Sequence, residues 1–228
     1  MVRKLYPPPE SAGEKDRMLQ NFMRLIIVRH PFERLLSAYR DKMLRVRNKK
    51  DPFVKLQRQI SQQYMNSEKT LSCNATVDTS STGQNKTPVH PSFTQFLEKV
   101  QDDVKRLWEK GHSSINLHWR PYWTTCAPCQ IDYDVIAHVE TLDWDQEYII
   151  RELGLQELLL NAHTHASNFD RYKGTSEAAQ FYFSQVPASL LRSLAQLYKP
   201  DFKLFGYSPE NYLKMTKREF VNDTLSEM

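Results

Sequence analysis

The sequence contains no apolar segment long enough to cross a membrane. Its longest purely aliphatic run is Leu25–Val28, whereas a membrane-spanning helix needs about 20 apolar residues. The first residues, 1–10, are basic and rich in proline and include no apolar stretch like that of a signal peptide. These absences are expected either of a cytosolic chain or of a chain whose targeting segment lies outside the sequence.

A strong excess of one charge is absent as well. The 228 residues include 31 Lys and Arg against 27 Asp and Glu, which leaves a net charge of +4. Nucleic-acid-binding domains usually concentrate a basic stripe, so this balance does not support such a partner. It suits an anionic small molecule or an acidic polysaccharide. Hydrophobic residues make up 40% of the chain, enough for the core of one domain.

Cysteine is scarce: the chain has three, Cys73, Cys126 and Cys129. The last two form a Cys-Ala-Pro-Cys motif, for which a structural disulfide, half of a metal site, a redox pair and inert thiols all remain open. A redox motif should open a helix after a strand, whereas a strand-like segment follows this one. We favour the disulfide and expect no metal, and Cys73 has an open choice of partner.

Three Asn-x-Thr triplets are candidate N-glycosylation sites, at Asn74, Asn85 and Asn222. The first two lie in the most polar stretch of the chain, where an acceptor would be exposed. Pro88 follows the second triplet and makes it a poorer acceptor. Together with the Cys-x-x-Cys motif, the triplets indicate the lumen of the secretory pathway.

The apolar pattern predicts strands alternating with helices, and therefore an α/β protein with a mainly parallel sheet. The expected elements are a buried parallel strand at Leu25–Val28, a second strand at residues 131–140, and helices at residues 32–43, 92–108, 143–153 and 188–198. We expect Gly154 to end the third of these helices and Pro200 to close the fourth. A loop is predicted at residues 1–16, and a long polar surface insertion at residues 61–90.

The first strand and helix form a plausible anion site. The apolar side chains of the helix recur at helical spacing, at Phe32, Leu35, Leu36, Tyr39 and Met43. Its other face carries Glu33, Arg34, Ser37, Arg40 and Asp41. Arg29 stands at the end of the strand, where ligands of open α/β sheets bind, and the helix directs its N–H groups and positive end to the same place. The alternative is a strand and a helix whose charges are merely solvated.

Residues 29–42 closely resemble the 3′-phosphate-binding motif of the carbohydrate sulfotransferases, in the group of the chondroitin 4-O-, dermatan 4-O- and HNK-1 sulfotransferases. That motif is an Arg, then Pro-Phe-Glu-Arg, then a Ser eight residues after the first Arg; Arg29 and Ser37 keep this spacing. Further similar blocks are His118-Trp119 with the Cys-x-x-Cys motif, Glu140-Thr-Leu with Asp145, and residues 198–207. The resemblance covers most of residues 20–213.

The resemblance implies a single sulfotransferase domain over residues 1–228, with a P-loop-NTPase-like fold. It implies transfer of sulfate from the nucleotide PAPS to a hydroxyl of a glycan such as an N-acetylgalactosamine-containing glycosaminoglycan, without a metal. Arg29, Arg34 and Ser37 would hold the 3′-phosphate. The catalytic base is unassigned, and His118 and Glu140 are candidates because they lie in similar blocks. The location implied is the luminal side of the Golgi membrane, as a glycoprotein with an N-terminal type II anchor.

One departure from the family pattern concerns the start of the chain. The loop that holds the 5′-phosphosulfate should precede the first strand and is not found, and no Gly-x-x-x-x-Gly-Lys-Ser/Thr motif occurs. We therefore expect a chain that begins after this loop and after the anchor, and that is inactive by itself. Three hypotheses follow: part of an active enzyme, a pseudoenzyme that retains the 3′-phosphate pocket, or an unrelated α/β protein with a zinc-stabilised Cys-x-x-Cys.

Overall fold

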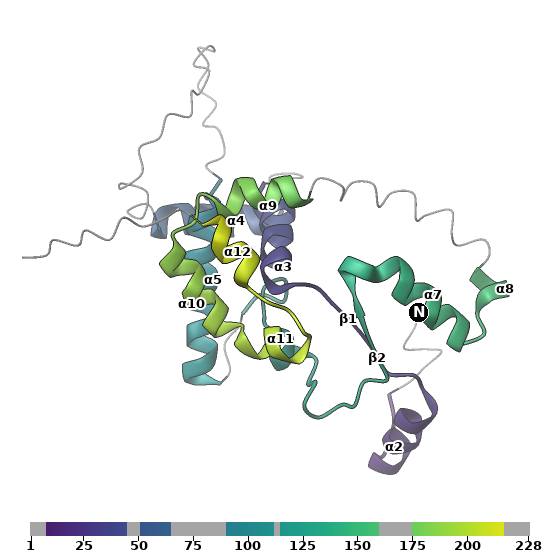
Figure 1. The fold of residues 1–228 in the computed structure, drawn as a ribbon. Helices are drawn as coiled ribbons and strands as arrows, with labels where there is room; N and C mark the ends of the chain where they lie inside the picture. The colour runs from purple at the N-terminus through teal and green to yellow at the C-terminus, as the bar shows by residue number, and fades with distance from the viewer. Residues whose placement is uncertain (1–7, 45–50, 65–89, 112–114, 160–174, 217–228) are drawn as a thin grey trace, which may run out of the picture. The chain divides into compact units, whose positions relative to one another are not determined.

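The computed structural model describes residues 8–44, 51–64, 90–111, 115–159 and 175–216 (Figure 1). The predictions for Cys73, Asn74, Asn85 and Asn222 lie outside these ranges. The chain is a mixed α/β protein that divides into two compact units, unit 1 within Met1–Arg29 and Tyr122–Asn168, and unit 2 within His30–Pro121 and Phe169–Met228. The single sulfotransferase domain over residues 1–228 stays a prediction.

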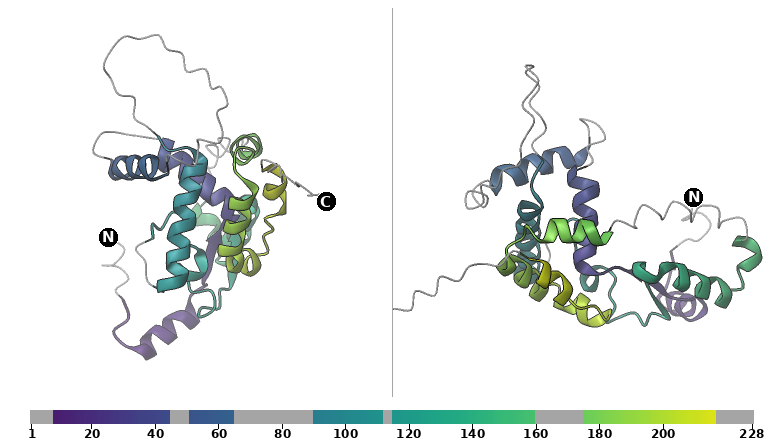
Figure 2. Two further views of the ribbon diagram at one scale, coloured as in Figure 1. Left: turned by 90° about the vertical axis from the view of Figure 1, so that its left-hand side faces the viewer. Right: turned by 45° about the horizontal axis from the view of Figure 1, so that its top comes forward.

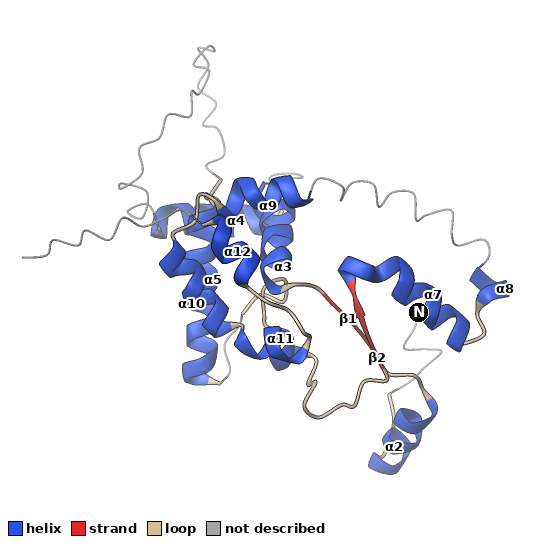
Figure 3. Ribbon diagram, viewed as in Figure 1, coloured by secondary structure: helices blue, strands red, loops and turns tan. Residues whose placement is uncertain are grey.

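Unit 1 contains a two-stranded parallel sheet with short helices. Its described elements are α2 (Ala12–Asn21), β1 (Leu25–Val28), α6 (Tyr122–Thr125), β2 (Val135–His138), the 3₁₀ turn η3 (Val139–Thr141), α7 (Leu142–Glu152) and α8 (Gln156–Leu159). Leu25 pairs with Val135 and Val28 with His138, so the described sheet is parallel, as predicted (Figure 3). The second strand is shorter than predicted, because β2 begins only at Val135 and η3 follows at residue 139.

The prediction of a buried strand at Leu25–Val28 is correct for one face of β1 only. Ile26 and Val28 are buried, whereas Leu25 and Ile27 are 38% and 48% exposed. Successive side chains of a strand point to opposite faces, so this alternation means that only one face of the strand is covered. An aliphatic run alone does not reveal whether one or both faces of a sheet are packed.

The loop predicted at residues 1–16 is also partly wrong, because α2 already begins at Ala12. Ser11 is its N-cap, and the Ser11 hydroxyl accepts a hydrogen bond from the Glu14 backbone N–H at 3.1 Å. The Glu14 carboxylate accepts one from the Glu10 backbone N–H at 2.7 Å. The spacing Ser-x-x-Glu is a known start signal of helices, so the sequence did carry the information.

Arg24 and Asp134 hold the two strands together at their beginning. The Asp134 carboxylate accepts hydrogen bonds from the Arg24 backbone N–H at 2.7 Å, from its Nε at 2.9 Å and from its Nη2 at 2.7 Å. The side-chain hydrogen bond from Arg24 is the main cause, and the bond from its backbone N–H the second, that lower the pKa of Asp134 from 3.8 to about 2. The carboxylate is therefore bound in its ionised form.

We expect the stability contribution of Asp134 to depend on pH. Its folded-state pKa is depressed, so the contribution is fully present well above pH 3.8 and is lost as the pH falls toward 2. Asp134→Asn should lower the melting temperature at pH 7 and leave it unchanged near pH 2. Thermal unfolding by circular dichroism between pH 7 and pH 2 measures this. Asp16→Asn, an exposed residue of α2, is the matched control, and an equal effect of Asp134→Asn at both pH values would contradict the assignment.

Unit 2 is helical. Its described elements are α3 (Pro31–Ala38), the π-helix η1 (Tyr39–Leu44), α4 (Pro52–Gln63), α5 (Phe93–Lys110), α9 (Thr175–Phe183), α10 (Ala188–Leu197), α11 (Lys199–Leu204) and α12 (Glu210–Met215). The long helix α5 packs against α4 and α10 (Figure 2). The predicted apolar stripe of the first helix is confirmed, since Phe32, Leu35, Leu36, Tyr39 and Met43 are all buried in this core. No helix among the described residues of either unit is long and apolar enough to cross a membrane.

Local signals set several helix ends in unit 2. Ser92 and Gln95 form a reciprocal capping box at the start of α5. Pro200, predicted to close a helix, instead lies in the first turn of α11, where its missing N–H costs nothing. The insertion predicted at residues 61–90 is wrong at its start, because Ser61 is a buried residue of α4. Residues 65–89 lie outside the described part of the chain, and for them the insertion stays a prediction.

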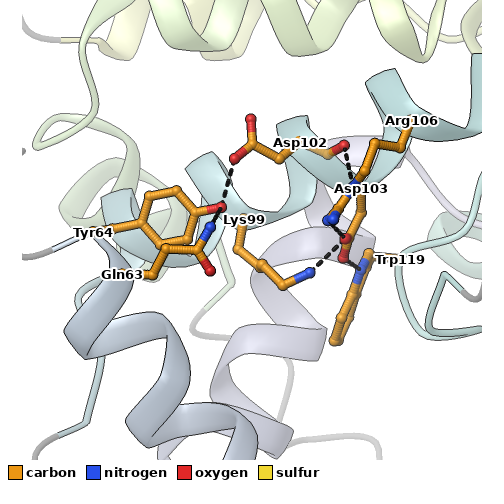
Figure 4. Close-up of polar contacts among 7 residues, drawn as sticks. All are labelled: Gln63, Tyr64, Lys99, Asp102, Asp103, Arg106 and Trp119. Carbon is orange, nitrogen blue, oxygen red and sulfur yellow. Dashed lines mark hydrogen bonds and ion pairs between the residues drawn. The ribbon is translucent and has the colours of Figure 1, made fainter. Parts of the chain in front are cut away.

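A polar network joins α4, α5 and the segment around Trp119 (Figure 4). The Asp103 carboxylate accepts hydrogen bonds from Lys99, from Arg106 at 2.5 Å and from the Trp119 indole N–H at 3.1 Å. Trp119 is 1% exposed, and its backbone carbonyl accepts a hydrogen bond from the buried Tyr198 hydroxyl. Because the indole N–H and the backbone carbonyl of Trp119 are both hydrogen-bonded, the segment around Trp119 has a defined position within unit 2.

Candidate functional site

Arg29 and Ser37 lie at the junction from strand to helix that the sequence predicts. Arg29 follows the last residue of β1 directly and is partly buried. Only His30 separates it from Pro31, the first residue of α3. Ser37 lies in the last turn of α3 and is partly exposed. Arg29 belongs to unit 1 and Ser37 to unit 2, so their joint grip on one phosphate stays a prediction.

The N–H groups at the start of α3 are largely used within the protein. Pro31 has none, the Phe32 N–H donates to His30 Nδ1 at 3.2 Å, and the Arg34 N–H donates to the His30 carbonyl at 2.9 Å. The expectation that free N–H groups of this helix face an anion is therefore wrong for Phe32, while the Arg34 N–H makes the first regular hydrogen bond of the helix. The helix still has its positive end, and the specific contacts to an anion would come from side chains.

Arg34 and Glu33 contribute to the folding of unit 2. The Arg34 guanidinium donates to the Leu117 carbonyl at 2.8 Å and so connects α3 to the segment that precedes His118. Its predicted contact with phosphate is untested and would have to use its other donors. Glu33, predicted on a solvated face, is instead buried, and its carboxylate accepts a hydrogen bond from the Tyr212 hydroxyl at 2.6 Å.

The π-helix η1 extends α3 and brings the charged side chains of Asp41 and Lys42 near His118. Lys42 forms an ion pair with Asp41 at 2.8 Å, and its Nζ lies 5.3 Å from the centre of the Phe53 ring. The ring of His118 lies 5.9 Å from that of Phe53. Short π-helical insertions are frequent at functional sites because they redirect the side chains that follow. The spacing of apolar residues predicts a regular helix over residues 32–43 and gives no sign of this π-helical turn.

His118 is the better-supported candidate for a proton acceptor. Its backbone N–H donates to the Asn116 side chain at 3.0 Å, which holds the turn. Partial desolvation lowers the pKa of His118, and the positive charge of Lys42 lowers it further. The imidazole is therefore neutral at physiological pH and able to accept a proton.

Glu140, the other candidate, lies in η3 of unit 1 and is exposed. Its surroundings are organised by Asp145, whose carboxylate accepts hydrogen bonds from the His138 N–H at 2.7 Å and from the Thr141 hydroxyl at 2.9 Å. The structure assigns no chemical role to Glu140. A role as catalytic base stays a prediction.

The Cys-x-x-Cys motif follows helix α6 and precedes β2. Cys126 is partly buried and Cys129 is exposed, with Ala127 between them in the left-handed region at φ 48°. The Tyr133 hydroxyl donates to the Cys126 carbonyl at 2.6 Å. A redox motif opens a helix after a strand, and this order is the reverse. The disulfide stays a prediction, and no cluster of three metal-ligating side chains occurs among the described residues.

Comparison with known proteins identifies the family. The family model described as the sulfotransferase family matches residues 5–208, and the chain belongs to this family. Carbohydrate sulfotransferase 10 of Xenopus laevis is 32% identical over 206 residues, which cover 89% of this chain and 52% of that protein. Carbohydrate sulfotransferase 11 of Rattus norvegicus is 29% identical over 205 residues, covering 90% and 52%.

Carbohydrate sulfotransferase 10 of Homo sapiens is 30% identical over 207 residues, which cover 89% of this chain and 52% of the relative. The chain thus spans about half the length of the curated relatives it matches. No solved structure matches the chain. The resemblance found in the sequence motif is confirmed at the level of the family.

Proposed function

We propose that this chain belongs to a carbohydrate sulfotransferase that transfers a sulfuryl group from PAPS to a hydroxyl of a glycan, with an N-acetylgalactosamine-containing glycosaminoglycan as the acceptor. The observation that carries the proposal is the motif from Arg29 to Ser37. It lies at a junction from strand to helix, in a chain that belongs to the sulfotransferase family and has relatives named carbohydrate sulfotransferases. The parallel pair β1 and β2 is compatible with the P-loop-NTPase-like fold that we also propose.

The side chains of the motif suit a phosphate group. The Arg29 guanidinium offers a planar fork of donors that matches two phosphate oxygens. Ser37 offers a hydroxyl, and α3 adds the partial positive charge of its first turn. Arg34 could donate to the same phosphate only from N–H groups other than the one bound to Leu117. In our proposal Arg29 is the main contact to the 3′-phosphate, and Ser37 and Arg34 are the lesser ones.

The proposed reaction breaks the bond between sulfur and the bridging oxygen of the donor and forms a bond between sulfur and the sugar oxygen. Adenosine 3′,5′-bisphosphate leaves with the electron pair of the broken bond, and the sugar hydroxyl loses its proton to a base. We assign this base to His118, because its lowered pKa keeps the imidazole neutral, and keep Glu140 as the alternative. Positioned cations can stabilise the sulfuryl oxygens without a metal.

The same proposal includes the luminal side of the Golgi membrane as the place of action, with an N-terminal anchor. Glycosylation at Asn74, Asn85 and Asn222 and a disulfide that involves Cys126 and Cys129 would be consistent with an oxidising lumen. The glycan acceptor is the only macromolecular partner proposed.

A transfer assay tests the proposal. Protein expressed from the complete reading frame in a secretory host is incubated with radiolabelled PAPS and with desulfated chondroitin, dermatan or a non-sulfated control glycan. Label is expected in a glycosaminoglycan, and it should be lost in Arg29→Ala and retained in Arg58→Ala, an exposed arginine on α4. Nucleotide binding without transfer to any glycan would indicate a non-catalytic binding protein. No binding of adenosine 3′,5′-bisphosphate would contradict the proposal altogether.

A further inference from the structure

His30 is a buried polar residue at the start of α3. It is 8% exposed, and aromatic rings surround it. The ring of Tyr212 lies 4.5 Å away, that of Tyr207 at 5.2 Å and that of Phe202 at 5.4 Å. An imidazole in such surroundings needs hydrogen-bond partners for both ring nitrogens, because a buried polar atom without a partner is costly.

The two partners of His30 determine its tautomer. Nδ1 lies 3.2 Å from the Phe32 backbone N–H, which can only donate, so Nδ1 must accept. Nε2 lies 2.9 Å from the Ser208 carbonyl, which can only accept, so Nε2 must donate. Both bonds exist together only in the neutral imidazole with its proton on Nε2. His30 is therefore an N-cap of α3 and at the same time a donor to a segment near the other end of the described chain.

The segment that His30 reaches is attached to α3 at a second point. The Tyr212 hydroxyl donates to the Glu33 carboxylate at 2.6 Å, about one helical turn from His30. A tight turn precedes this segment, with Gly206 in the left-handed region at φ 68° and the Tyr207 N–H bound to the Phe202 carbonyl. We call Tyr207, Ser208 and Tyr212 the C-terminal clamp. It lies within unit 2, as does α3.

We propose that His30 is a positioning residue for the sulfate donor. His30 connects the C-terminal clamp to the first turn of α3, the helix that carries Ser37. Arg29 directly precedes His30 in the chain. The His30 cap therefore also restrains the backbone at Arg29, the proposed main contact to the 3′-phosphate. This proposal rests on the proposed function. It adds a residue that does not touch the nucleotide and that acts through α3.

Protonation of His30 would break this arrangement. A second proton on Nδ1 would point at the Phe32 N–H, so the N-cap would be lost and two donors would face each other. The titratable groups in contact with this cluster are Glu33, held by Tyr212, and the two tyrosines of the clamp; Asp201, next to Phe202 on α11, is fully buried. Glu33 is the acidic residue in the first turn of α3, and a negative charge on its side chain would favour the protonated form of the His30 imidazole.

The tautomer is measured directly by ¹⁵N NMR of the histidine rings, without any ligand. We expect His30 to give the signals of an Nε2–H imidazole at pH 7, with assignment by comparison with His30→Asn. A His30 ring that is doubly protonated at pH 7, or that carries its proton on Nδ1, would overturn the proposal. This measurement does not depend on whether the protein binds PAPS.

The second measurement is the affinity for adenosine 3′,5′-bisphosphate between pH 5 and pH 8, by calorimetry. His30→Ala loses the cap and should bind up to roughly 10-fold more weakly at pH 7, because a lost N-cap weakens the helix start by about that factor at most and the affinity reports the part coupled to binding. In His30→Asn the side-chain oxygen can still accept from Phe32, so we expect most of the affinity to return. Because Asn does not titrate, the fall in affinity at acidic pH should be smaller in His30→Asn than in the unaltered protein. Ionisation of the ligand is common to all three proteins and cancels in the comparison.

Two results would contradict the positioning role. One is an equal affinity of His30→Ala and the unaltered protein, and the other is an acid loss in His30→Asn as large as in the unaltered protein. Tyr212→Phe separates the two attachments, since it removes the bond to Glu33 and keeps the ring against His30. A failure of the unaltered protein to bind the nucleotide at any pH would contradict the proposed function instead, and the NMR result then decides the state of His30 alone.

Discussion

Arg29→Ala is expected to weaken the binding of adenosine 3′,5′-bisphosphate by roughly 30- to 900-fold, which corresponds to about 2–4 kcal/mol. The reason is the loss of a charge-assisted contact that two N–H groups of one guanidinium make to one phosphate. Arg29 directly follows β1 and precedes the cap of α3, so its backbone is held from both sides. Isothermal titration calorimetry with the purified protein measures the change.

Three variants make this test specific. Arg29→Lys keeps the charge and loses the fork, so its affinity should be intermediate. Ser37→Ala removes one hydroxyl and should cost roughly 10-fold or less. Arg58→Ala removes an exposed arginine from α4 and should change nothing. Thermal unfolding of each variant shows whether it is folded. An Arg29→Ala protein that is folded and binds with unchanged affinity would eliminate the assignment of the 3′-phosphate to this motif.

His118→Gln is expected to lower kcat by about 10²- to 10⁴-fold, the usual contribution of a general base, while the affinity for the nucleotide stays the same. A pH profile adds a second readout. The pKa of His118 is lowered from 6.5, so kcat/KM should rise with pH through an inflection below 6.5 and reach a plateau at neutral pH. Steady-state kinetics of sulfate transfer at saturating PAPS measures both effects.

The positive charge of Lys42, next to His118, allows the direction of the pKa shift of His118 to be checked. Lys42 lowers the pKa of His118, so Lys42→Gln should move the inflection of the profile to higher pH. The control variant for His118→Gln is Glu140→Gln, which should leave kcat near that of the unaltered protein if His118 is the base. Should Glu140→Gln lose kcat while His118→Gln keeps it, the roles of the two residues are the reverse of our assignment.

The sequence alone was sufficient for features that depend on neighbouring residues. The strand at Leu25–Val28, the apolar stripe from Phe32 to Met43 and the helix that Gly154 ends follow from local periodicity and backbone preference, and the structure has all three. The motif from Arg29 to Ser37 was sufficient to predict the family, which the comparisons confirm. The Ser-x-x-Glu spacing at Ser11 could have predicted α2 in the same way.

Only the tertiary structure decided which polar residues are buried and what they contact. Glu33 lies on the polar face of the predicted helix, and nothing near Glu33 or His30 in the sequence predicts that Tyr212 and Ser208, almost 180 residues away, form hydrogen bonds with them. The same holds for Trp119, whose buried indole N–H donates to Asp103 of α5. Periodicity and caps are set by a few consecutive residues, whereas burial and the protonation state of a side chain depend on partners that the folded chain brings from distant positions.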